Sequence, residues 1–161
     1  MIDRFGAVSG SRFFLALLLS IIRVSDAGGH TTPIDDSGTQ LLDPSVSMRW
    51  QSAVPQRSGN NNLMIGTTRV RLRMNVTPWL RHTGRIYLVL PAQPPGQITA
   101  TWSTEGRLRP GKVNSGCRTL VYAGPITTPF MEDVLTLQFS IDGTLMQRPT
   151  PVNFRVEIDE D

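Results

Sequence analysis

Hydrophobic and polar residues alternate along much of the chain after residue 45, and turn-forming residues such as Pro91 and Asp142-Gly143 separate the alternating segments. Alternation with a period of two gives a segment one apolar face, which is typical of a half-buried β-strand. No window shows sustained helical periodicity. The pattern predicts seven strands, within residues 46–50, 70–76, 85–90, 97–103, 118–123, 135–141 and 152–158.

Seven short strands with one apolar face each favour two antiparallel sheets that pack against one another, because neither sheet can bury its apolar face alone. The expected fold is therefore all-β, an immunoglobulin-like antiparallel β-sandwich, with a small barrel as the alternative. The 161 residues include 14 glycines and 12 prolines, which fits a turn-rich chain and argues against a helical bundle. The length corresponds to one domain.

The first 27 residues have the organisation of a secretory signal peptide. Arg4 and Arg12 precede an apolar stretch over residues 13–22, and Ser25-Asp26-Ala27 provides a small-x-small exit. The apolar stretch is shorter than the roughly 20 residues of a membrane-spanning helix, and no later stretch is longer, so no transmembrane segment is expected. An uncleaved anchor or a buried helix is the alternative to a signal peptide.

Beyond the signal peptide, the sequence divides into a polar leader over residues 28–45 and a domain over residues 46–161. Charge is sorted along these parts. Residues 28–43 hold three acids and no base, whereas residues 44–131 hold eleven bases and one acid, Glu105. Residues 132–161 hold seven acids against Arg148 and Arg155, so the excess of bases is confined to the middle of the chain.

Three arginines occupy alternate positions of one predicted strand, Arg69, Arg71 and Arg73. Alternate residues of a strand share a face, so the guanidinium groups form a row with roughly 7 Å between neighbours. Such a row could bind carboxylates or sulfates, as in acidic glycans, or simply be a solvated sheet face. Trp79 and Arg81, which lie in a turn, are further candidates for contact with such a ligand.

The remaining aromatic and sulfur-containing residues are expected to be structural. Trp50 and Trp102 lie in phase with apolar strand positions, so both are predicted to pack in the core. Cys117 is the only cysteine, which excludes an internal disulfide. It is interpreted as a buried strand residue, with a reactive or intermolecular thiol as the alternative.

The sequence predicts no catalytic set, no metal site and no cofactor. Two histidines without a paired cysteine motif do not make a standard zinc site, and neither a Gly-x-Ser-x-Gly elbow nor a phosphate-binding loop occurs. A hydrolase that uses His82 is the remaining enzymatic alternative. Nucleic acid is an unfavourable partner, because the chain is expected to be exported and its aromatic residues do not interleave with its bases.

This organisation, a signal, a polar leader, a series of short strands and the ending PVNFRVEID, resembles that of subunits of bacterial chaperone–usher fimbriae. The resemblance implies an immunoglobulin-like sandwich that lacks one strand and accepts it from another chain. It also implies export through the periplasm to a fimbrium on the cell surface, or to the medium. The partners would be a periplasmic chaperone, an outer-membrane usher and other fimbrial subunits, with a host glycan or protein receptor if the subunit contributes to adhesion.

Carried over to this chain, the resemblance implies that Val152, Phe154, Val156 and Ile158 border the strand-accepting groove. Ile34, Leu41 and Leu42 are the apolar residues with which the leader would act as a donor strand. Because these are few, a tip or other minor subunit is the expected role. The rival hypothesis is a self-sufficient secreted β-sandwich that binds acidic glycans through the arginine row.

Overall fold

The computed structural model describes residues 30–43, 45–52, 62–92, 97–144 and 152–160, so the predicted signal peptide lies outside the described residues. These residues form ten β-strands and one short 3-10 helix, η2 (Thr77–Trp79). The strands are β1 (Thr31–Pro33), β2 (Gln40–Leu41), β3 (Arg49–Trp50), β4 (Leu63–Asn75), β5 (Thr83–Leu90), β6 (Ile98–Thr104), β7 (Gly111–Asn114), β8 (Cys117–Pro125), β9 (Phe130–Asp142) and β10 (Arg155–Glu160).

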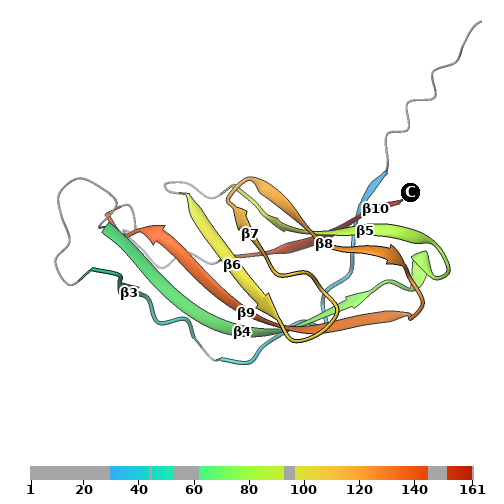
Figure 1. Ribbon diagram of the computed structural model, residues 1–161, viewed down its shortest axis with the longest axis horizontal. Coiled ribbons are helices and arrows are strands. Elements are labelled where there is room, and N and C mark those ends of the chain that lie inside the picture. Colours follow the sequence, from blue (N-terminus) through green and yellow to red (C-terminus); the bar gives the residue numbers. More distant parts are fainter. Residues whose placement is uncertain (1–29, 44, 53–61, 93–96, 145–151, 161) are drawn as a thin grey trace, which may run out of the picture.

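The strands form two separate sheets rather than one closed barrel. One sheet has the order β1-β10-β5-β8, and the other has the order β2-β4-β9-β6-β7, with β3 also paired to β4. The two sheets form the two layers seen in Figure 1. Neighbouring strands run antiparallel throughout. The predicted all-β sandwich is confirmed.

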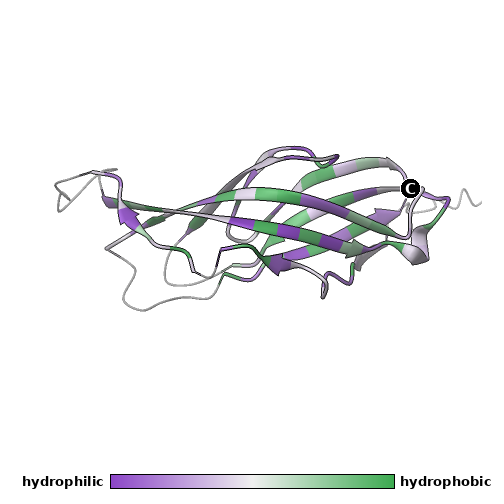
Figure 2. Cartoon of the chain, turned by 90° about the horizontal axis from the view of Figure 1, so that it is seen from below, coloured by the Kyte–Doolittle hydropathy of each residue, from purple (hydrophilic) through white to green (hydrophobic). Residues whose placement is uncertain are grey.

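The longest ladder joins β4 to β9 along thirteen residue pairs, from Leu63 opposite Asp142 to Asn75 opposite Phe130. Successive residues of β4 alternate between the interior and the solvent, as the period of a strand requires. Figure 2 shows the resulting alternation of hydrophobic and hydrophilic residues along the strands. The inward residues of both sheets form one core, in which the largest fully buried side chains include Met74, Ile86, Leu90, Ile126 and Ile158.

Six of the seven predicted strands are present, with shifted ends. The exception is 46–50, where only Arg49–Trp50 pairs in a ladder. The alternating apolar residues of this segment pack against β4 without forming a ladder. Gly66 on β4 has no side chain, and the side chains of Val46 and Met48 lie in the space that a Cβ on Gly66 would occupy. The last strand begins at Arg155 rather than at Val152.

The polar leader contributes a strand to each sheet. β1 pairs with β10, and Ile34 then donates its N–H to the carbonyl oxygen of Val156 at 2.8 Å. The next residue, Asp35, bridges to Asn75 at the end of β4, so the chain crosses from one sheet to the other here. The crossing is the descending segment after β1 in Figure 1. β2 then continues along β4.

Candidate functional site

An open groove lies between the two sheets, along the edge formed by β2 and β10. Its volume is about 340 Å³. The floor consists of inward-facing residues from β4, β5 and β9, and the walls come from residues 36–41 and 152–156. The lining residues are Asp36, Thr39, Leu41, Val70, Leu72, Leu88, Leu135, Leu137, Val152, Asn153, Phe154 and Val156.

At Phe154, the main chain beside this groove has no backbone partner in the part of the chain that the structure describes. Because Ile34 bonds to the carbonyl oxygen of Val156, and every second residue of a strand points its N–H and C=O to the same side, the corresponding groups of Phe154 face the groove edge. Within the described residues, these groups of Phe154 form no backbone hydrogen bond. Farther along, β1 covers residues 157–159 of the same edge. The site therefore has an open half beside residues 152–154 and a closed half that begins at Val156, where Ile34 and then β1 cover the edge.

Apolar side chains face solvent in the open half. Leu41 is paired with Val70, whose side chain also lines the groove, yet Leu41 remains 68% exposed. On the other wall, the ring of Phe154 packs against the ring of Phe139, with 5.9 Å between the ring centroids. Phe154 is only partly buried. Leucine exposed to this extent inside a concave surface is a feature of binding sites rather than of closed cores.

The structure distributes the predicted groove residues between the two halves. Val152, Phe154 and Val156 line the groove. Of these three, Val156 is also a core residue, at 2% exposure, and Ile158 is fully buried at 0% exposure on the part of β10 that β1 covers. Of the predicted donor residues, Ile34 is buried in the core of its own domain, while Leu41 and Leu42 remain exposed. Donation of the leader to another subunit stays a prediction, and it would require Ile34 to leave this core.

Asp36 is the one charged residue among those that line the groove. It lies directly after the crossing segment, at the end of the groove that this segment closes. Burial raises the pKa of the Asp36 carboxyl, and the neighbouring charge of Asp35 adds to the rise, against a hydrogen bond from its own backbone. Among the described residues, no side chain forms a hydrogen bond or an ion pair with Asp36. No local pattern predicts this position, because residues 28–43 read as a solvated acidic leader.

The arginine row, Arg69, Arg71 and Arg73, lies on the outer face of β4. All three arginine side chains are exposed to solvent. Two of them are already paired within the domain: Arg69 with Glu105 and Arg73 with Glu132, each at 3.1 Å. Arg73 also lies over the ring of Phe130, 4.6 Å from its centroid. Only Arg71 lacks an ion pair with another described residue. These pairs neutralise much of the charge that an acidic ligand would need.

The tryptophans and Cys117 correct three expectations from the sequence. Trp79 is buried, because its indole N–H donates to Glu160 at 2.7 Å where η2 packs against β10, so it is not an exposed ligand contact. Trp50 is 42% exposed rather than in the core, since it lies on β3 at the edge of the sheet. Cys117 is exposed at the start of β8. Only Trp102 is buried as expected.

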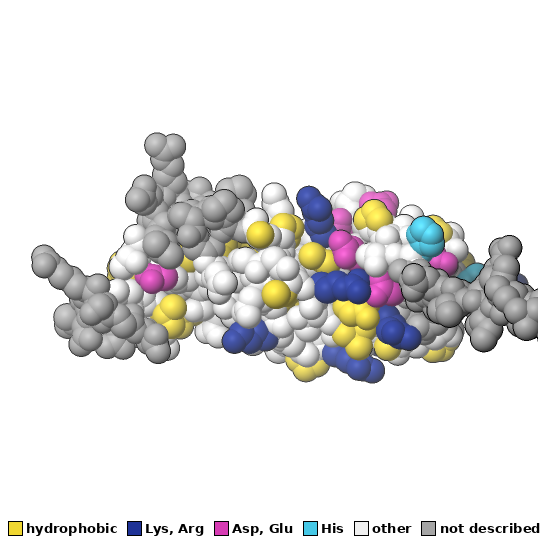
Figure 3. Space-filling model, turned by 90° about the horizontal axis from the view of Figure 1, so that it is seen from above, with side chains coloured by type: hydrophobic (Ala, Val, Ile, Leu, Met, Phe, Trp, Pro, Cys, Tyr) yellow, Lys and Arg dark blue, Asp and Glu magenta, His cyan; other side chains and the backbone are white. Residues whose placement is uncertain are grey.

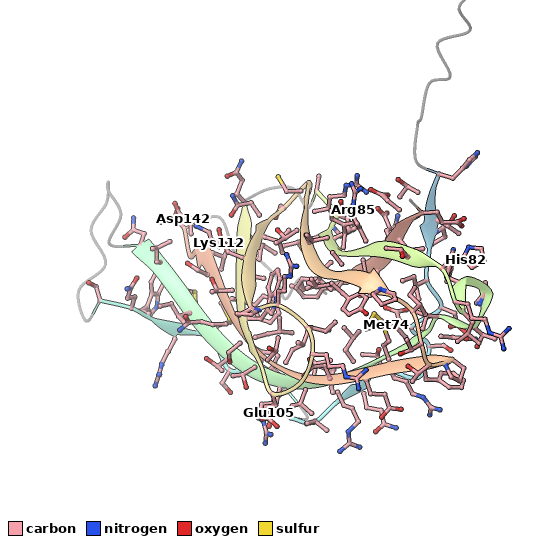
Figure 4. The ribbon with its side chains drawn as sticks, turned by 45° about the vertical axis from the view of Figure 1, so that its right-hand side comes forward. Met74, His82, Arg85, Glu105, Lys112 and Asp142 are labelled. Carbon is pink, nitrogen blue, oxygen red and sulfur yellow. The ribbon has the colours of Figure 1, made fainter. Side chains whose placement is uncertain are left out.

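Arg81 does not join the arginine row. It lies in the turn between η2 and β5, with a φ of 70°, and its N–H donates to the carbonyl oxygen of Ile126 at 2.8 Å. His82, the residue of the hydrolase alternative, follows it in the same turn (Figure 4). Neither residue contributes to the groove lining.

The outer face of the sheet that contains β10 carries a network of opposite charges. Arg118 on β8 donates two hydrogen bonds to Asp159 on β10, at 2.9 and 3.0 Å, across the ring of Tyr87. Thr31 of β1 donates to the same carboxylate at 2.6 Å. The hydrogen bonds from Arg118 are the main cause that lowers the pKa of Asp159. Basic and acidic side chains lie next to one another on the face of the molecule that Figure 3 shows.

Asp133 is the buried carboxylate of the described chain, and its role is structural. Its Oδ2 accepts the N–H of Leu108 at 2.9 Å, which holds the loop between β6 and β7. A Cβ on Gly106 would lie 2.8 Å from the carboxylate carbon, so this loop closes directly over Asp133. In the described residues, no three histidine, cysteine or acidic side chains come together as a metal site.

No helix within the described ranges has the length and apolar character needed to cross a membrane. Comparisons with models of protein families, with curated proteins and with solved structures each gave no match to this chain.

Proposed function

We propose that this chain is an exported, strand-accepting structural subunit, of the kind assembled into chaperone–usher fimbriae, and that a β-strand from another chain completes its sandwich. The observation that carries the proposal is the groove beside residues 152–154, directly before β10. It combines the exposed side chain of Leu41 with main-chain groups of Phe154 that have no backbone partner in the described ranges, and an added strand satisfies both at once.

An added strand fits this site better than a compact ligand does. The main-chain groups of Phe154, directly before β10, have no backbone partner among the described residues, and the short strand β2 contributes to the opposite wall. A strand laid between them would bond to Phe154 and place every second side chain on Leu72, Leu88 and the other floor residues. The proposed subunit therefore has no catalytic role. A periplasmic chaperone would supply the strand first, and a neighbouring subunit would supply it after assembly.

The rival function, binding of acidic glycans through the arginine row, has less support. Arg69 and Arg73 are held in ion pairs with acids of the same sheet, and Trp79 is withdrawn into the interior. A glycan would have to compete with these pairs. The row fits a solvated outer face of a sandwich, whose mixed charges keep it from pairing with other sheets.

The test uses the 161-residue chain with its own N-terminus, so that processing occurs during export. We expect the exported chain to unfold at a low denaturant concentration by itself. Addition of a capped peptide of about seven residues, in which valine and threonine alternate, should raise the unfolding midpoint with increasing peptide concentration. A stable, cooperatively folded monomer whose midpoint ignores the peptide would contradict the proposal.

A matched pair of variants localises the effect. Leu41→Glu places a charge on the exposed groove wall and should abolish stabilisation by the peptide, while the chain alone keeps its unfolding midpoint. Gln40→Glu adds the same charge one residue away, on the outer face opposite Arg71, and should leave peptide stabilisation intact. Equal loss in both variants would place the peptide outside the groove.

A further inference from the structure

The groove has one end that is chemically different from the rest. Ile34 and Asp35 cross between the sheets there, bonded to Val156 on one side and to Asn75 on the other. A strand that enters beside Val152 therefore meets a barrier at Val156, where Ile34 already occupies the edge. Asp36 lines the groove at this closed end, where the other lining side chains of the same segment are Thr39 and Leu41.

Asp36 has no counter-charge among the described residues. Of the bases on the neighbouring strand β4, Arg73 pairs with Glu132, and Arg71 lies on the outer face opposite Gln40. A carboxylate that is partly removed from water and unpaired destabilises its surroundings, and an incoming cation would relieve this cost. The other lining residues are neutral, so the groove has one acidic side chain, and it lies at a fixed distance from the open end.

The geometry points to a register-setting role for Asp36: we propose that the accepted strand carries a lysine or arginine whose side chain pairs with Asp36 at the closed end of the groove. This inference rests on the proposed function. It specifies the partner as a strand with apolar residues at alternate positions and one basic residue near the end that reaches the crossing segment.

The same charge argument disfavours a second copy of this chain as the donor. Residues 28–43 contain Asp35, Asp36 and Asp43 and no lysine or arginine. Inserted into the groove of another copy, this leader would add acids beside Asp36 instead of the missing base. The donor strand should therefore come from a different protein, which suits a subunit present once rather than in a long homopolymer.

The experiment measures binding of the valine–threonine peptide with lysine placed at each valine position in turn, and with methionine at the same positions as the uncharged control. We expect one position at which lysine binds about tenfold more tightly than methionine, as a hydrogen-bonded ion pair at a partly buried site allows. A peptide of residues 28–43 should bind more weakly than the lysine peptide.

The variant Asp36→Asn should remove the advantage of lysine and leave binding of the methionine peptides unchanged. The matched control is Asp35→Asn, since asparagine can keep the hydrogen bond that the Asp35 side chain accepts from the N–H of Ser37. It should retain the full advantage of lysine.

The outcomes separate the two proposals. If peptides bind in the groove with no preferred lysine position, or if the preference survives Asp36→Asn, the role of Asp36 is wrong and the strand-accepting function stands. If no alternating peptide binds at all, both proposals fail. Tighter binding of the peptide of residues 28–43 would overturn the expectation of a foreign donor.

Discussion

The two halves of segment 152–158, in which β10 begins at Arg155, have the same sequence pattern and different surroundings. Val152, Phe154, Val156 and Ile158 alternate with polar residues without a break. β1 covers the second half, so Ile158 is fully buried, whereas no described strand covers the first half and its side chains line a groove. Alternation thus specifies which face of a strand is apolar, and the neighbouring strand decides whether that face is closed.

Proline fits the place where β1 ends. Because Ile34 and Val156 are a hydrogen-bonded pair, the preceding pair of Pro33 and Glu157 is a non-bonded one, where a missing N–H costs nothing. β1 is thereby compatible with a strand edge that stops at the crossing. The open half begins at the point where the leader leaves β10.

The largest difference between the halves should appear in the free energy of unfolding when an isoleucine of the closed half and a leucine of the open half are each replaced by alanine. Ile158→Ala removes a fully buried side chain and should lower the free energy of unfolding by about 3 kcal/mol. Leu41→Ala removes a side chain of equal size from the open groove and should cost less than about 0.5 kcal/mol, because that side chain is mostly in water. Chemical denaturation of both variants measures the difference.

Binding of a strand should reduce the difference between the stability costs of Ile158→Ala and Leu41→Ala. With the valine–threonine peptide bound, Leu41 becomes covered, and Leu41→Ala should cost about 1 kcal/mol or more of the stabilisation that the peptide provides. Equal costs for the two variants without peptide would mean that the open half is already closed, and the comparison between the halves would fail.

A smaller effect on stability is expected from the hydrogen bond between Asp159 and Thr31, which holds β1 on the closed half. Asp159 accepts hydrogen bonds from Arg118 and from Thr31 of β1, and these lower its pKa from the ordinary value of 3.8. A carboxyl with a lowered folded pKa adds stability above its ordinary pKa, and this stability is lost as the pH falls through the folded value. Asp159→Asn should therefore cost about 0.5 kcal/mol at pH 7 and almost nothing near pH 2.

The measurement is the denaturation midpoint at a series of pH values between 7 and 2. Glu157→Gln serves as the control, since Glu157 lies two residues away on the same face of β10 and forms no hydrogen bond with Arg118 or Thr31. An unchanged pH profile in Asp159→Asn would show that Arg118 and Thr31 do not act through this carboxylate.

The sequence was sufficient for the fold and for part of the site. Period-two alternation identified the inward residues of β4, β9 and β10, because long strands bury one face regardless of their partners. It did not identify β1 and β2, whose few residues pair with β10 and β4 through main-chain groups that every residue type carries. The exposure of Leu41 and the position of Asp36 depend on that pairing, so no local pattern marks them.

The predicted burial of two tryptophans was wrong for a related reason. Trp79 follows Pro78 in a turn and looks exposed, yet η2 closes one end of the sandwich and Glu160 accepts its indole N–H. Trp50 lies in phase with apolar residues, yet its strand is at the edge of a sheet. Burial of these side chains is set by contacts between segments far apart in the chain, which periodicity does not report.

The smallest effect is expected where neither half of the site is touched. Arg71 lies on the outer face of β4 opposite Gln40, without an ion pair to another described residue. Arg71→Gln should change the free energy of unfolding by less than about 0.5 kcal/mol and leave peptide binding unaltered. It should also leave retention on immobilised sulfated glycan nearly unchanged, because a solvated row with two internal ion pairs offers little to such a ligand. If retention of the unaltered protein is strong, declines with added salt and is lost in Arg71→Gln, the outer face binds acidic glycans and the rival function gains the support that the ion pairs deny it.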